Sequence, residues 1–474
     1  MDTRAARPGV PLTIAARLNR LPVTRRHKKI IAIIALGNFF EIYELFLAGV
    51  LAATLTTKFA LTGFDLSLVL ASAFVGAFVG AISIGRIADR LGRRRAYMIT
   101  LGLYSVFTLL AAFSTDLWML VLCRFIAGVG LGGELPVTDS FLGDILPSKR
   151  RGYFVAWAFT LSYTAVPVVG FIGMAMVDTS PLGIEGWRWM FALGALGAVI
   201  TFFLRRHLPE SPRWLESVGR ADEAEEITRE LEAAARAEGW TPPIEDEAPS
   251  PVGTEPVNAS AMLRKPLLRR TITMAIVWVL AVIGYHGFSS VATLVLTGKG
   301  ISVTNSLLYV SLAFIGYPVG SLLSMFVMDR FERKWLLGGS LVAMAALGLA
   351  YGNAVTPVWI VLWGFMFTVI ANLMSNVTHV YQLEQYPTAI RTTATGRLYS
   401  LGRLSTAAAP LYLIPLLEHS GAGAVFTLVA ATLAVAAVVT VGFGVATTGR
   451  TLEEISPGDA PTAVVNPQPA RTAP

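Results

Sequence analysis

The sequence predicts an all-α membrane protein with about twelve transmembrane helices, arranged as two parallel six-helix repeats. Hydrophobic residues make up 54% of the 474 residues and charged residues only 15%. The mean hydropathy is +0.60, far above that of soluble proteins. The apolar residues form runs of about 20 residues or more, the length that crosses a roughly 30 Å hydrocarbon core. These runs begin near Ile30, Leu66, Ala96, Leu117, Tyr153, Trp187, Thr271, Ser302, Leu336, Pro357, Thr392 and Ala424.

The positions of the basic residues predict the topology. Arg and Lys cluster in alternate loops (4–29, 90–95, 149–151, 264–270 and 330–334), and the loops between them carry little positive charge. By the positive-inside rule, we expect both termini and the long middle loop in the cytoplasm and the spans in the plasma (inner) membrane. The net charge of +7 then reflects topology and not nucleic-acid binding.

The first apolar run follows a basic tail, as the core of a signal peptide does. It is too long for a signal peptide and lacks a small-residue cleavage site, so we expect it to remain as the first span. The single Cys123 excludes an intramolecular disulfide and a cysteine-rich metal site. No metal ion and no cofactor are expected.

The middle of the chain changes in composition. The stretch EAEEITRELEAAARAEG (223–239) is charged with a helical pattern, and PPIEDEAPSPVGTEP (242–256) is Pro-rich and acidic. We interpret them as a short amphipathic helix followed by a flexible linker. The expected segments are a cytoplasmic N-terminal segment (1–29), a first six-helix bundle (30–207), a cytoplasmic linker with a short helix (208–266), a second six-helix bundle (267–449) and a disordered tail (450–474).

An internal repeat supports the division into two halves. DRLGRRR begins at Asp89 and DRFERK at Asp329, whereas DILPSKRR begins at Asp144 and EQYPTAIR at Glu384. Both pairs of motifs are offset by 240 residues (329 − 89 and 384 − 144). Two motifs matched at one offset predict two parallel repeats, with the linker between them.

Several motifs resemble those of a known superfamily. GRIADRLGRRR (85–95) resembles the loop between the second and third helices of the major facilitator superfamily. RFIAGVGLGGELPV with DILPSKRRG, LPESPRWL (208–215) and YQLEQYPTAIR resemble its sugar-porter side. RLNRLPVTRRH, GGELPV and GRLSTAAAP (402–410) are most similar to the nicotinate-type and synaptic-vesicle-glycoprotein-like branch. The similarity runs from about 17 to 450, and it implies secondary transport by alternating access. The chain departs from the pattern at Glu41 and Glu44, where Asp is commoner, and at TTATG after Arg391.

The motif residues at the cytoplasmic helix ends predict a gate. Asp89 is placed to cap a helix or to pair with Arg93. Asp144 with Arg151, and Glu384 with Arg391, place opposite charges at mirrored helix ends, where ion pairs would hold the halves together while the cavity opens outward. The alternative is that these charges only fix topology. The expected gate residues are Gly85, Asp89, Gly92, Arg93, Asp144, Arg151, Glu210, Arg213, Asp329, Arg333, Glu384 and Arg391.

The run GVGLGG (128–133) formally fits GxGxxG. A dinucleotide fingerprint needs a preceding strand, whereas these glycines lie within a span, so we expect them to serve close helix packing. The sequence contains no GxxxxGK[ST] motif and shows no nucleophile–base pair or metal cluster in the spans, so neither ATP coupling nor an enzyme is expected.

Two acids, Glu41 and Glu44, interrupt the first span and share one helix face. A charge near the bilayer centre costs about 2.5–3.5 kcal/mol on insertion scales, so such residues usually face a cavity and take part in transport. Arg124 of the fourth span lies at a depth comparable to that of Glu44. In proton-coupled sugar porters an acid of the first helix partners an Arg of the fourth, and the resemblance implies this proton-coupling role for Glu44 and Arg124. A permanently ionised structural pair is the alternative, and Glu41 could instead bind substrate.

A candidate substrate site lies in later spans. Arg403 is near mid-depth without an acid nearby in sequence, which suggests an anionic ligand, because guanidinium matches carboxylate. A basic residue in this helix is associated with anion selectivity in related carriers. Alternatively, Arg403 pairs with Glu134, Asp139 or backbone carbonyls. The other candidate ligand contacts are Asn372, Asn376, His286, Tyr285 and Glu134, each with an ordinary packing role as the alternative, and Trp278, Phe288, Tyr317 and Tyr399 are candidates for an aromatic wall.

These observations favour proton-coupled symport of a small organic anion, such as an aromatic monocarboxylate. A sugar or polyol symporter and a drug-type exporter are the alternatives within transport. A transporter-like receptor is a further alternative, but the linker and tails look too short for a signalling domain. The expected partners are a small-molecule substrate, protons and the lipid bilayer, and the expected state is a monomer.

Overall fold

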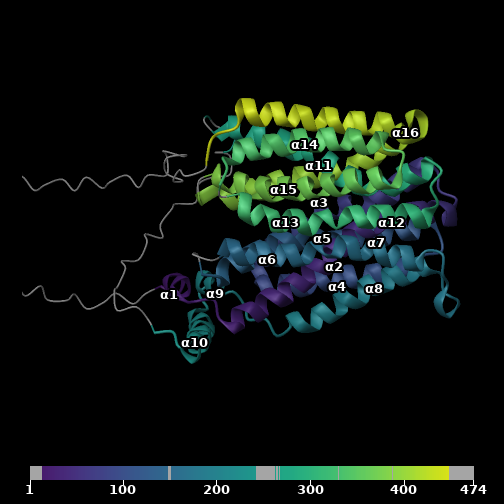
Figure 1. Cartoon of the computed structure of the whole chain (residues 1–474). Coiled ribbons are helices and arrows are strands. Elements are labelled where there is room, and N and C mark those ends of the chain that lie inside the picture. Colours follow the sequence, from purple (N-terminus) through teal and green to yellow (C-terminus); the bar gives the residue numbers. More distant parts are fainter. Residues whose placement is uncertain are drawn as a thin grey trace, which may run out of the picture.

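The protein is described here by a computed structural model covering residues 13–147, 151–241, 262, 265, 267–328, 330–386 and 388–447. Long helices run side by side along one axis, and three short helices gather at one end of this bundle (Figure 1). We call this the α10 end and the opposite one the far end. The short helices are α1 (Ile14–Arg20), α9 (Pro212–Ser217) and α10 (Ala221–Ala237).

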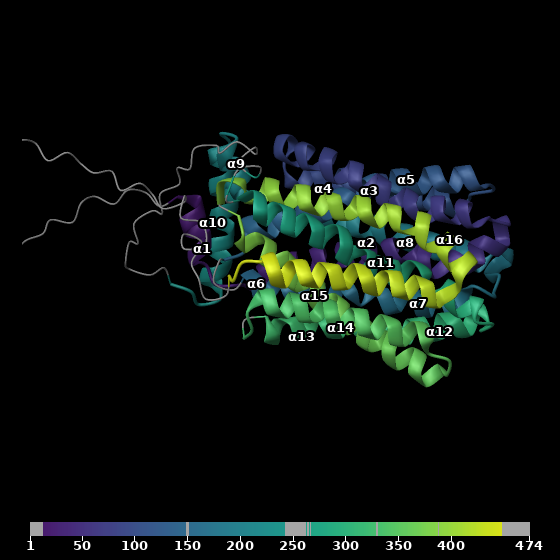
Figure 2. The ribbon, with the colours of Figure 1, turned by 90° about the horizontal axis from the view of Figure 1, so that it is seen from above.

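The long helices before and after α10 form two halves. The first half contains α2 (Arg25–Phe59), α3 (Gly63–Leu91), α4 (Arg93–Ala112), α5 (Leu117–Ile145), α6 (Arg151–Tyr163), α7 (Ala165–Met176), the short 3₁₀ turn Pro181–Gly183 and α8 (Gly186–Arg205). The second half contains α11 (Leu267–Gly298), α12 (Val303–Phe314), α13 (Gly316–Val327), α14 (Arg333–Asn353), α15 (Pro357–Glu384) and α16 (Thr388–Phe443). Seen from above, α3, α4 and α5 lie on one side and α12 to α15 on the other, with α2 and α11 between them (Figure 2).

Eleven helices or helix pairs in the described part of the chain are long and apolar enough to cross a membrane. The last of them, Ala394–Phe443, has 50 residues. It would extend over about 75 Å if it were straight, more than twice the bilayer core. Gly421 interrupts it with φ 76° and ψ −179°, a conformation open to glycine but not to other residues. The chain therefore turns back at Gly421, and the expected count of about twelve spans agrees with the structure.

Two spans are broken near their middle, which the sequence analysis did not predict. The fifth span divides into α6 and α7 at Thr164, and the eighth divides into α12 and α13 at Ile315. In each span a proline, Pro167 or Pro318, follows three residues after the break. Proline has no N–H to donate to the carbonyl four residues earlier, so the helical ladder loses a bond at each break.

The glycines of GVGLGG pack α5 closely against α3, as the sequence predicts. A Cβ atom added at Gly128 would lie 2.1 Å from the Ala73 carbonyl oxygen, and one at Gly132 would lie 1.9 Å from that of Ala77. Only glycine permits this approach of the two backbones.

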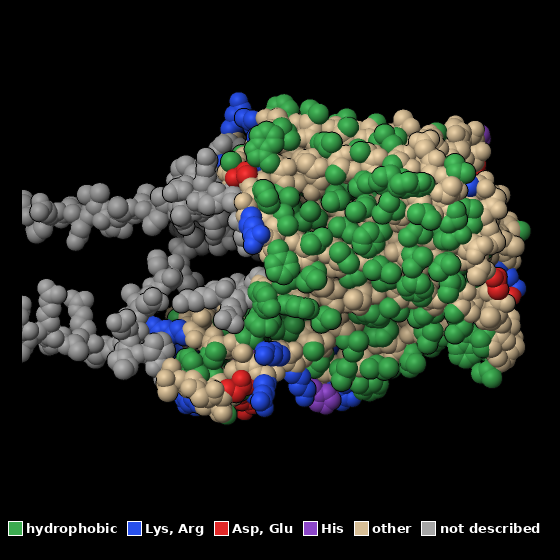
Figure 3. All heavy atoms as spheres, in the orientation of Figure 1, with side chains coloured by type: hydrophobic (Ala, Val, Ile, Leu, Met, Phe, Trp, Pro, Cys, Tyr) green, Lys and Arg blue, Asp and Glu red, His purple; other side chains and the backbone are tan. Residues whose placement is uncertain are grey.

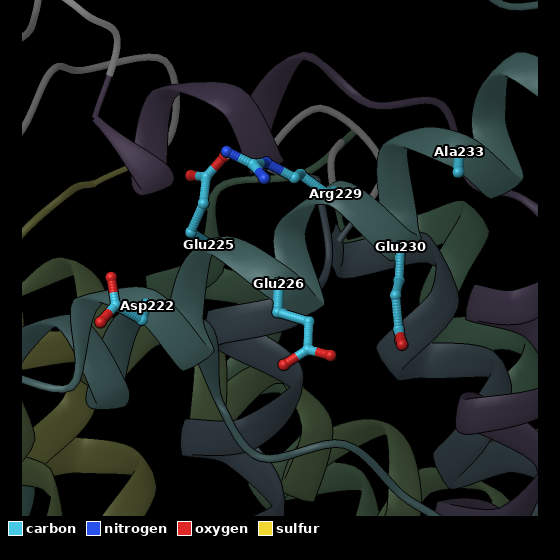
Figure 4. Close-up of a pocket in the computed structure, with 6 residues that line it drawn as sticks. All are labelled: Asp222, Glu225, Glu226, Arg229, Glu230 and Ala233. Carbon is cyan, nitrogen blue, oxygen red and sulfur yellow. The ribbon is translucent and has the colours of Figure 1, made fainter.

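The three short helices form a small unit of their own. Leu18 of α1, Leu215 of α9 and Leu231 of α10 are fully buried and pack in one hydrophobic cluster. Arg17 joins α1 to α10 through ion pairs with Glu225 and Glu232. A recess of about 630 Å³ on α10 is lined mainly by carboxylates, with Arg229 facing Glu225 (Figure 4). Since this recess lies outside the spans, we do not treat it as a substrate site.

The outer surface of the bundle suits a bilayer. Apolar side chains cover most of the face in Figure 3, and Lys and Arg gather towards its ends. Exposed residues such as Phe203 of α8, Phe326 of α13 and Val438 of α16 lie on this surface. Large exposed apolar areas are stable only next to lipid or a partner protein. The structure therefore agrees with the predicted all-α membrane class.

Candidate functional site

The first buried ion pair joins α2 to α5. Arg124 Nη1 lies 3.2 Å from Glu44 Oε1, and the two side chains are 1% and 2% exposed. The Arg124 Nε also donates to the Val69 carbonyl of α3 at 3.4 Å. This pairing was expected from the comparable depth of the two residues together with the resemblance to proton-coupled sugar porters. Burial opposes a bare carboxylate and the guanidinium stabilises it, so proton binding at Glu44 competes with Arg124.

Glu41 faces the second half. It is 1% exposed, and its charge acts on Arg403 and Tyr399 of α16 and on Tyr163 of α6. Glu41 and Glu44 are three residues apart on α2, yet they interact with arginines of different halves. The sequence pattern placed the two acids on one helix face but did not predict this division.

Arg403 lies where the two halves meet and is 6% exposed. One of its terminal nitrogens, Nη2, donates to the hydroxyl of Tyr399, and its guanidinium lies 4.8 Å from the centre of the Tyr399 ring. Its Nε and Nη1 have no hydrogen-bond partner within the described part of the chain. Arg403 therefore offers N–H donors that a ligand could use.

Aromatic side chains from three helices surround Arg403. Its charge acts on Tyr163 of α6, on Tyr285 and His286 of α11 and on His379 of α15. The Tyr285 and His286 rings lie 4.8 Å apart in an edge-to-face arrangement. The expected substrate contacts Arg403, Tyr285 and His286 thus come together, joined by Tyr163 and His379, which the sequence analysis missed.

Asn372 and Asn376 lie on α15 and contact α13. Asn372 is fully buried, and its Nδ2 donates to the Tyr317 carbonyl at 2.7 Å. Its Oδ1 accepts from the Tyr285 hydroxyl at 3.3 Å. The Asn376 Nδ2 donates to the Ser324 hydroxyl at 2.8 Å. These contacts correspond to the packing alternative for both residues, although Asn372 also positions Tyr285.

Glu134 has other partners than those expected. It forms an ion pair with Arg205, the last residue of α8, and both side chains are 0% exposed. The Thr100 hydroxyl donates to its Oε2 at 3.0 Å. Glu134 is therefore not the partner of Arg403, and we leave it out of the substrate site. The sequence analysis did not single out Arg205, because a basic residue at the end of a span is typical of topology.

Arg205 is held from several sides. Its guanidinium lies 4.3 Å from the centre of the Tyr97 ring, and its Nη2 donates to the Ile34 carbonyl at 3.3 Å. A Cβ atom at Gly37 would lie 1.9 Å from that nitrogen. Gly37 of α2 thus makes room for the guanidinium, and the ion pair ties α2 to α5 and α8.

Two ion pairs at the α10 end obey the 240-residue repeat. In the first half Arg93 Nε lies 3.7 Å from Asp144 Oδ2, and in the second half Arg333 Nε lies 3.1 Å from Glu384 Oε1. The sequence analysis had proposed other partners, Arg151 and Arg391. Each observed pair joins helices of one half, and the expected pairs with Arg151 and Arg391 involve side chains that lie outside the described part of the chain. Arg93 and Arg333 begin the third span of each half (α4 and α14), and Asp144 and Glu384 lie at the end of the fourth (α5 and α15), so each pair joins the third span to the fourth.

Glu210 contacts the first half next to α9, whereas Arg213 joins two of the short helices to each other. Glu210 Oε1 accepts from the backbone N–H groups of Arg93 at 2.9 Å and Arg94 at 3.2 Å, so it caps the first turn of α4. A Cβ atom at Gly92, where φ is +97°, would lie 2.3 Å from Glu210 Oε2. Arg213 donates to the Asn19 side chain of α1 at 2.9 Å.

For the remaining expected gate positions, either the whole residue or its side chain lies outside the part that the structure describes. They are Gly85, Asp89, Arg151, Asp329 and Arg391.

Polar contacts between the halves occur at the middle and the far end. Thr160 of α6 donates to the Ser321 hydroxyl of α13 at 3.1 Å. The Thr293 hydroxyl of α11 donates to the Gly49 carbonyl of α2 at 3.0 Å. A cavity of about 10 Å³ lies beside Arg124 and is lined by residues of both halves. It has room for about one water molecule.

Comparisons with known proteins agree with this architecture. The model of the sugar (and other) transporter family matches residues 30–458. The putative metabolite transport protein YyaJ of Bacillus subtilis (strain 168) is 32% identical over 392 residues, which cover 82% of this chain and 86% of the relative. The niacin transporter NiaP of Acinetobacter baylyi is 29% identical over 446 residues, covering 94% and 100%.

A solved structure shares the fold. The partially occluded inward-open form of the xylose transporter XylE from E. coli matches with a TM-score of 0.72 and 22% identity, over 90% of this chain and 99% of that one. This similarity confirms the predicted major facilitator fold. With the family match over most of the sequence, it shows that this chain belongs to the sugar transporter family of the major facilitator superfamily and is a multi-pass secondary transporter.

Proposed function

We propose that the protein is a proton-coupled symporter of a small organic anion, with an aromatic monocarboxylate as the preferred substrate class. The observation that carries this proposal is Arg403, a buried cation between the halves whose Nε and Nη1 lack a hydrogen-bond partner within the described residues. A buried charge is costly unless its donors are satisfied. A substrate carboxylate would accept from these donors.

The aromatic surroundings of Arg403 support a ring-bearing substrate. Tyr399, Tyr163 and Tyr285 interact with Arg403 from three different helices, and aromatic rings prefer offset or edge-to-face contacts with one another. The relative NiaP is named a niacin transporter, and niacin is an aromatic carboxylate. The two sequences align at 29% identity over 94% of this chain and 100% of NiaP, and this similarity supports the same substrate class.

Glu44 and Arg124 are the proposed proton-coupling pair. When Arg124 neutralises Glu44, the carboxylate keeps its charge, and when Arg124 moves away, burial favours protonation. Glu41 contributes a second acid beside the proposed anion site. A substrate carboxylate at Arg403 would be repelled by an ionised Glu41, so anion binding favours the protonated form of Glu41.

Alternating access would place the substrate between the halves. The ion pairs Arg93–Asp144 and Arg333–Glu384 are the proposed gate elements at the α10 end, together with Glu210 and Arg213. We place this end in the cytoplasm of a cell whose plasma (inner) membrane holds the spans, because the basic loop clusters gather there. The proposed domain boundaries are those of the sequence analysis, with six-helix bundles at 30–207 and 267–449.

The test is uptake into liposomes that contain the purified protein. Radiolabelled nicotinate, benzoate and glucose are offered separately, with and without an inward acid gradient. The variants are Arg403→Gln and Glu44→Gln. Arg397→Gln is the matched control, since Arg397 lies six residues earlier on α16 and is exposed. We expect acid-driven carboxylate uptake that Arg403→Gln abolishes and Arg397→Gln preserves, and we expect Glu44→Gln to exchange substrate without concentrating it.

Three outcomes would overturn the proposal. Uptake of glucose without the carboxylates would favour the sugar alternative. Concentration of substrate by Glu44→Gln would contradict the proton-coupling role of Glu44. Equal loss in Arg403→Gln and Arg397→Gln would show that Arg403 is not a specific anion site.

A further inference from the structure

One face of α4 carries buried hydroxyl groups between the two buried ion pairs of the first half. Thr100, Tyr104 and Thr108 follow at intervals of four residues and are 0%, 1% and 1% exposed. Residues four apart lie on the same face of a helix. Such a row of buried hydroxyls is unusual inside an apolar bundle, where each polar group needs a partner.

The two ends of this row lie beside the two acids. The Thr100 hydroxyl donates to Glu134 Oε2 at 3.0 Å. The Tyr104 and Thr108 hydroxyls have no hydrogen-bond partner among the described residues, and Thr108 lies near enough to Glu44 to act on its carboxylate. Tyr104, between them, is acted on by the charges of Glu134, Glu44 and Glu41. The row therefore begins at one buried carboxylate and ends at the other.

The packing around Tyr104 seals this row from the space between the halves. Tyr104 packs in a cluster with Ala127 and Leu131 of α5 and Ala198 of α8, all buried. A Cβ atom at Gly130 of α5 would lie 2.7 Å from the Thr100 carbonyl and 3.0 Å from the Tyr104 Cβ. Glycine at this position lets α4 approach α5 closely. The hydroxyl row is thus enclosed within the first half.

We propose that Thr108, Tyr104 and Thr100 relay the coupling proton between Glu44 and Glu134, along a route separate from the substrate path. This inference rests on the proposed proton coupling at Glu44. A hydroxyl group is able both to donate and to accept a hydrogen bond, as a relay requires, and the open capacity of the Tyr104 and Thr108 hydroxyls is available to bridging water. Neighbouring positions are about 6 Å apart along the helix axis, a distance that a single bridging water spans.

The transfer balances as an exchange between two acids. The O–H bond of protonated Glu44 breaks, each hydroxyl and each bridging water accepts one proton and passes on another, and a new O–H bond forms on the Glu134 carboxylate. Afterwards Arg124 neutralises Glu44. Arg205 stays protonated beside neutral Glu134, and no electron is transferred.

The groups that face these acids fit the two ends of such a relay. Glu44 is faced by Arg124 of α5, by Thr108 and Tyr104 of α4 and by Tyr43 of its own helix. On α8, a Cβ added at Gly194 would lie 3.4 Å from Glu44 Oε2. Glu134 is faced by Arg205 of α8 and by Thr100, Tyr97 and Tyr104 of α4, with the Ile34 carbonyl of α2 on the other side of Arg205. Arg205 ends α8 at the α10 end, so Glu134 is the member of the pair closer to that exit.

The test compares Tyr104→Phe with the matched control Tyr351→Phe. Tyr351 is also a fully buried tyrosine, but it lies on α14 of the second half among Phe288 and Phe426. We expect Tyr104→Phe to slow acid-driven net uptake about tenfold or more. Substrate exchange, which needs no net proton movement, should stay within about twofold of wild type, and Tyr351→Phe should change neither rate.

Two further variants keep the outcome decisive. If Tyr104→Phe loses exchange as well, Thr100→Val and Thr108→Val replace it, with the same expected loss of net uptake. Wild-type net uptake in Tyr104→Phe, or in both threonine variants, would overturn the relay. Failure of the relay is distinguishable from failure of the proposed proton coupling at Glu44. In the second case Glu44→Gln would still concentrate substrate.

Discussion

Replacing Gly132 with alanine tests how closely α3 and α5 must approach. The added Cβ would lie 1.9 Å from the Ala77 carbonyl oxygen and 2.5 Å from the Ala77 carbonyl carbon, whereas ordinary Cβ contacts begin at 3.4 Å. The obstacle is backbone, which cannot rotate away as a side chain can. The two helices would have to separate by about 1.5 Å at this point, and overpacking of this kind costs about 1–3 kcal/mol.

The loss should be concentrated in the interface of α3 with α5. Gly76, Gly80 and Gly128 make equally close contacts in that interface, at 2.0–2.1 Å from backbone oxygens. A separation of the two helices at Gly132 would also lengthen the close contacts at these three glycines. The upper part of the estimated range, about 3 kcal/mol, is therefore expected.

The chain supplies its own probe for this measurement. Cys123 is the single cysteine and is 5% exposed on α5, so a thiol-reactive fluorophore reports when the first half opens on heating. Gly143→Ala is the control, because a Cβ there would have nothing within 4 Å. Alanine is the better helix former by about 1 kcal/mol, so this control should melt at or above the wild-type temperature. A Gly132→Ala protein that melts like Gly143→Ala would refute the reasoning.

Two further predictions concern ion pairs. Arg205→Met leaves Glu134 ionised and buried, which should lower the stability of the fold by about 3–5 kcal/mol. In the same thermal assay, the double variant Glu134→Gln/Arg205→Met should recover most of this loss. Equal melting temperatures of the single and double variants would contradict the prediction. Arg17→Ala should release α1 from α10 and raise the rate of limited proteolysis at the N-terminus, whereas Arg20→Ala should not. The hydrogen bond from Arg17 lowers the pKa of Glu225 below its ordinary 4.5, so this link is fully present above that pH and is lost as the pH falls through the lowered value. Wild type and Arg17→Ala should therefore be cleaved at similar rates in acid.

The sequence predicted those features that depend on the lengths of the apolar runs, on the internal repeat and on the depth of a residue in the membrane. Apolar run lengths predicted the spans, and comparable depth together with the resemblance to proton-coupled sugar porters predicted the pairing of Glu44 with Arg124. The Glu134–Arg205 pair escaped prediction, because a long arginine at a helix end reaches inward over a distance that hydropathy does not encode. The breaks at Thr164 and Ile315 had a signal that was not used, a proline three residues later in each span. The repeat itself also carried the pairing of Arg93 with Asp144 and Arg333 with Glu384, since all four positions obey one offset.

Under the proposed function, the two glutamates of α2 couple substrate binding to protonation. Glu41 interacts with Arg403 of the second half and Glu44 with Arg124 of the first, and three residues of helix separate the two acids by about 4.5 Å along the axis. If a bound anion and an ionised glutamate of α2 were about 8 Å apart, their repulsion would be roughly 2 kcal/mol at an effective dielectric of about 20. An anion that binds at Arg403 would therefore favour a proton on α2, and movement of one half relative to the other would alter both arginine contacts together. A single short stretch of α2 thus offers a direct electrostatic link between substrate and proton.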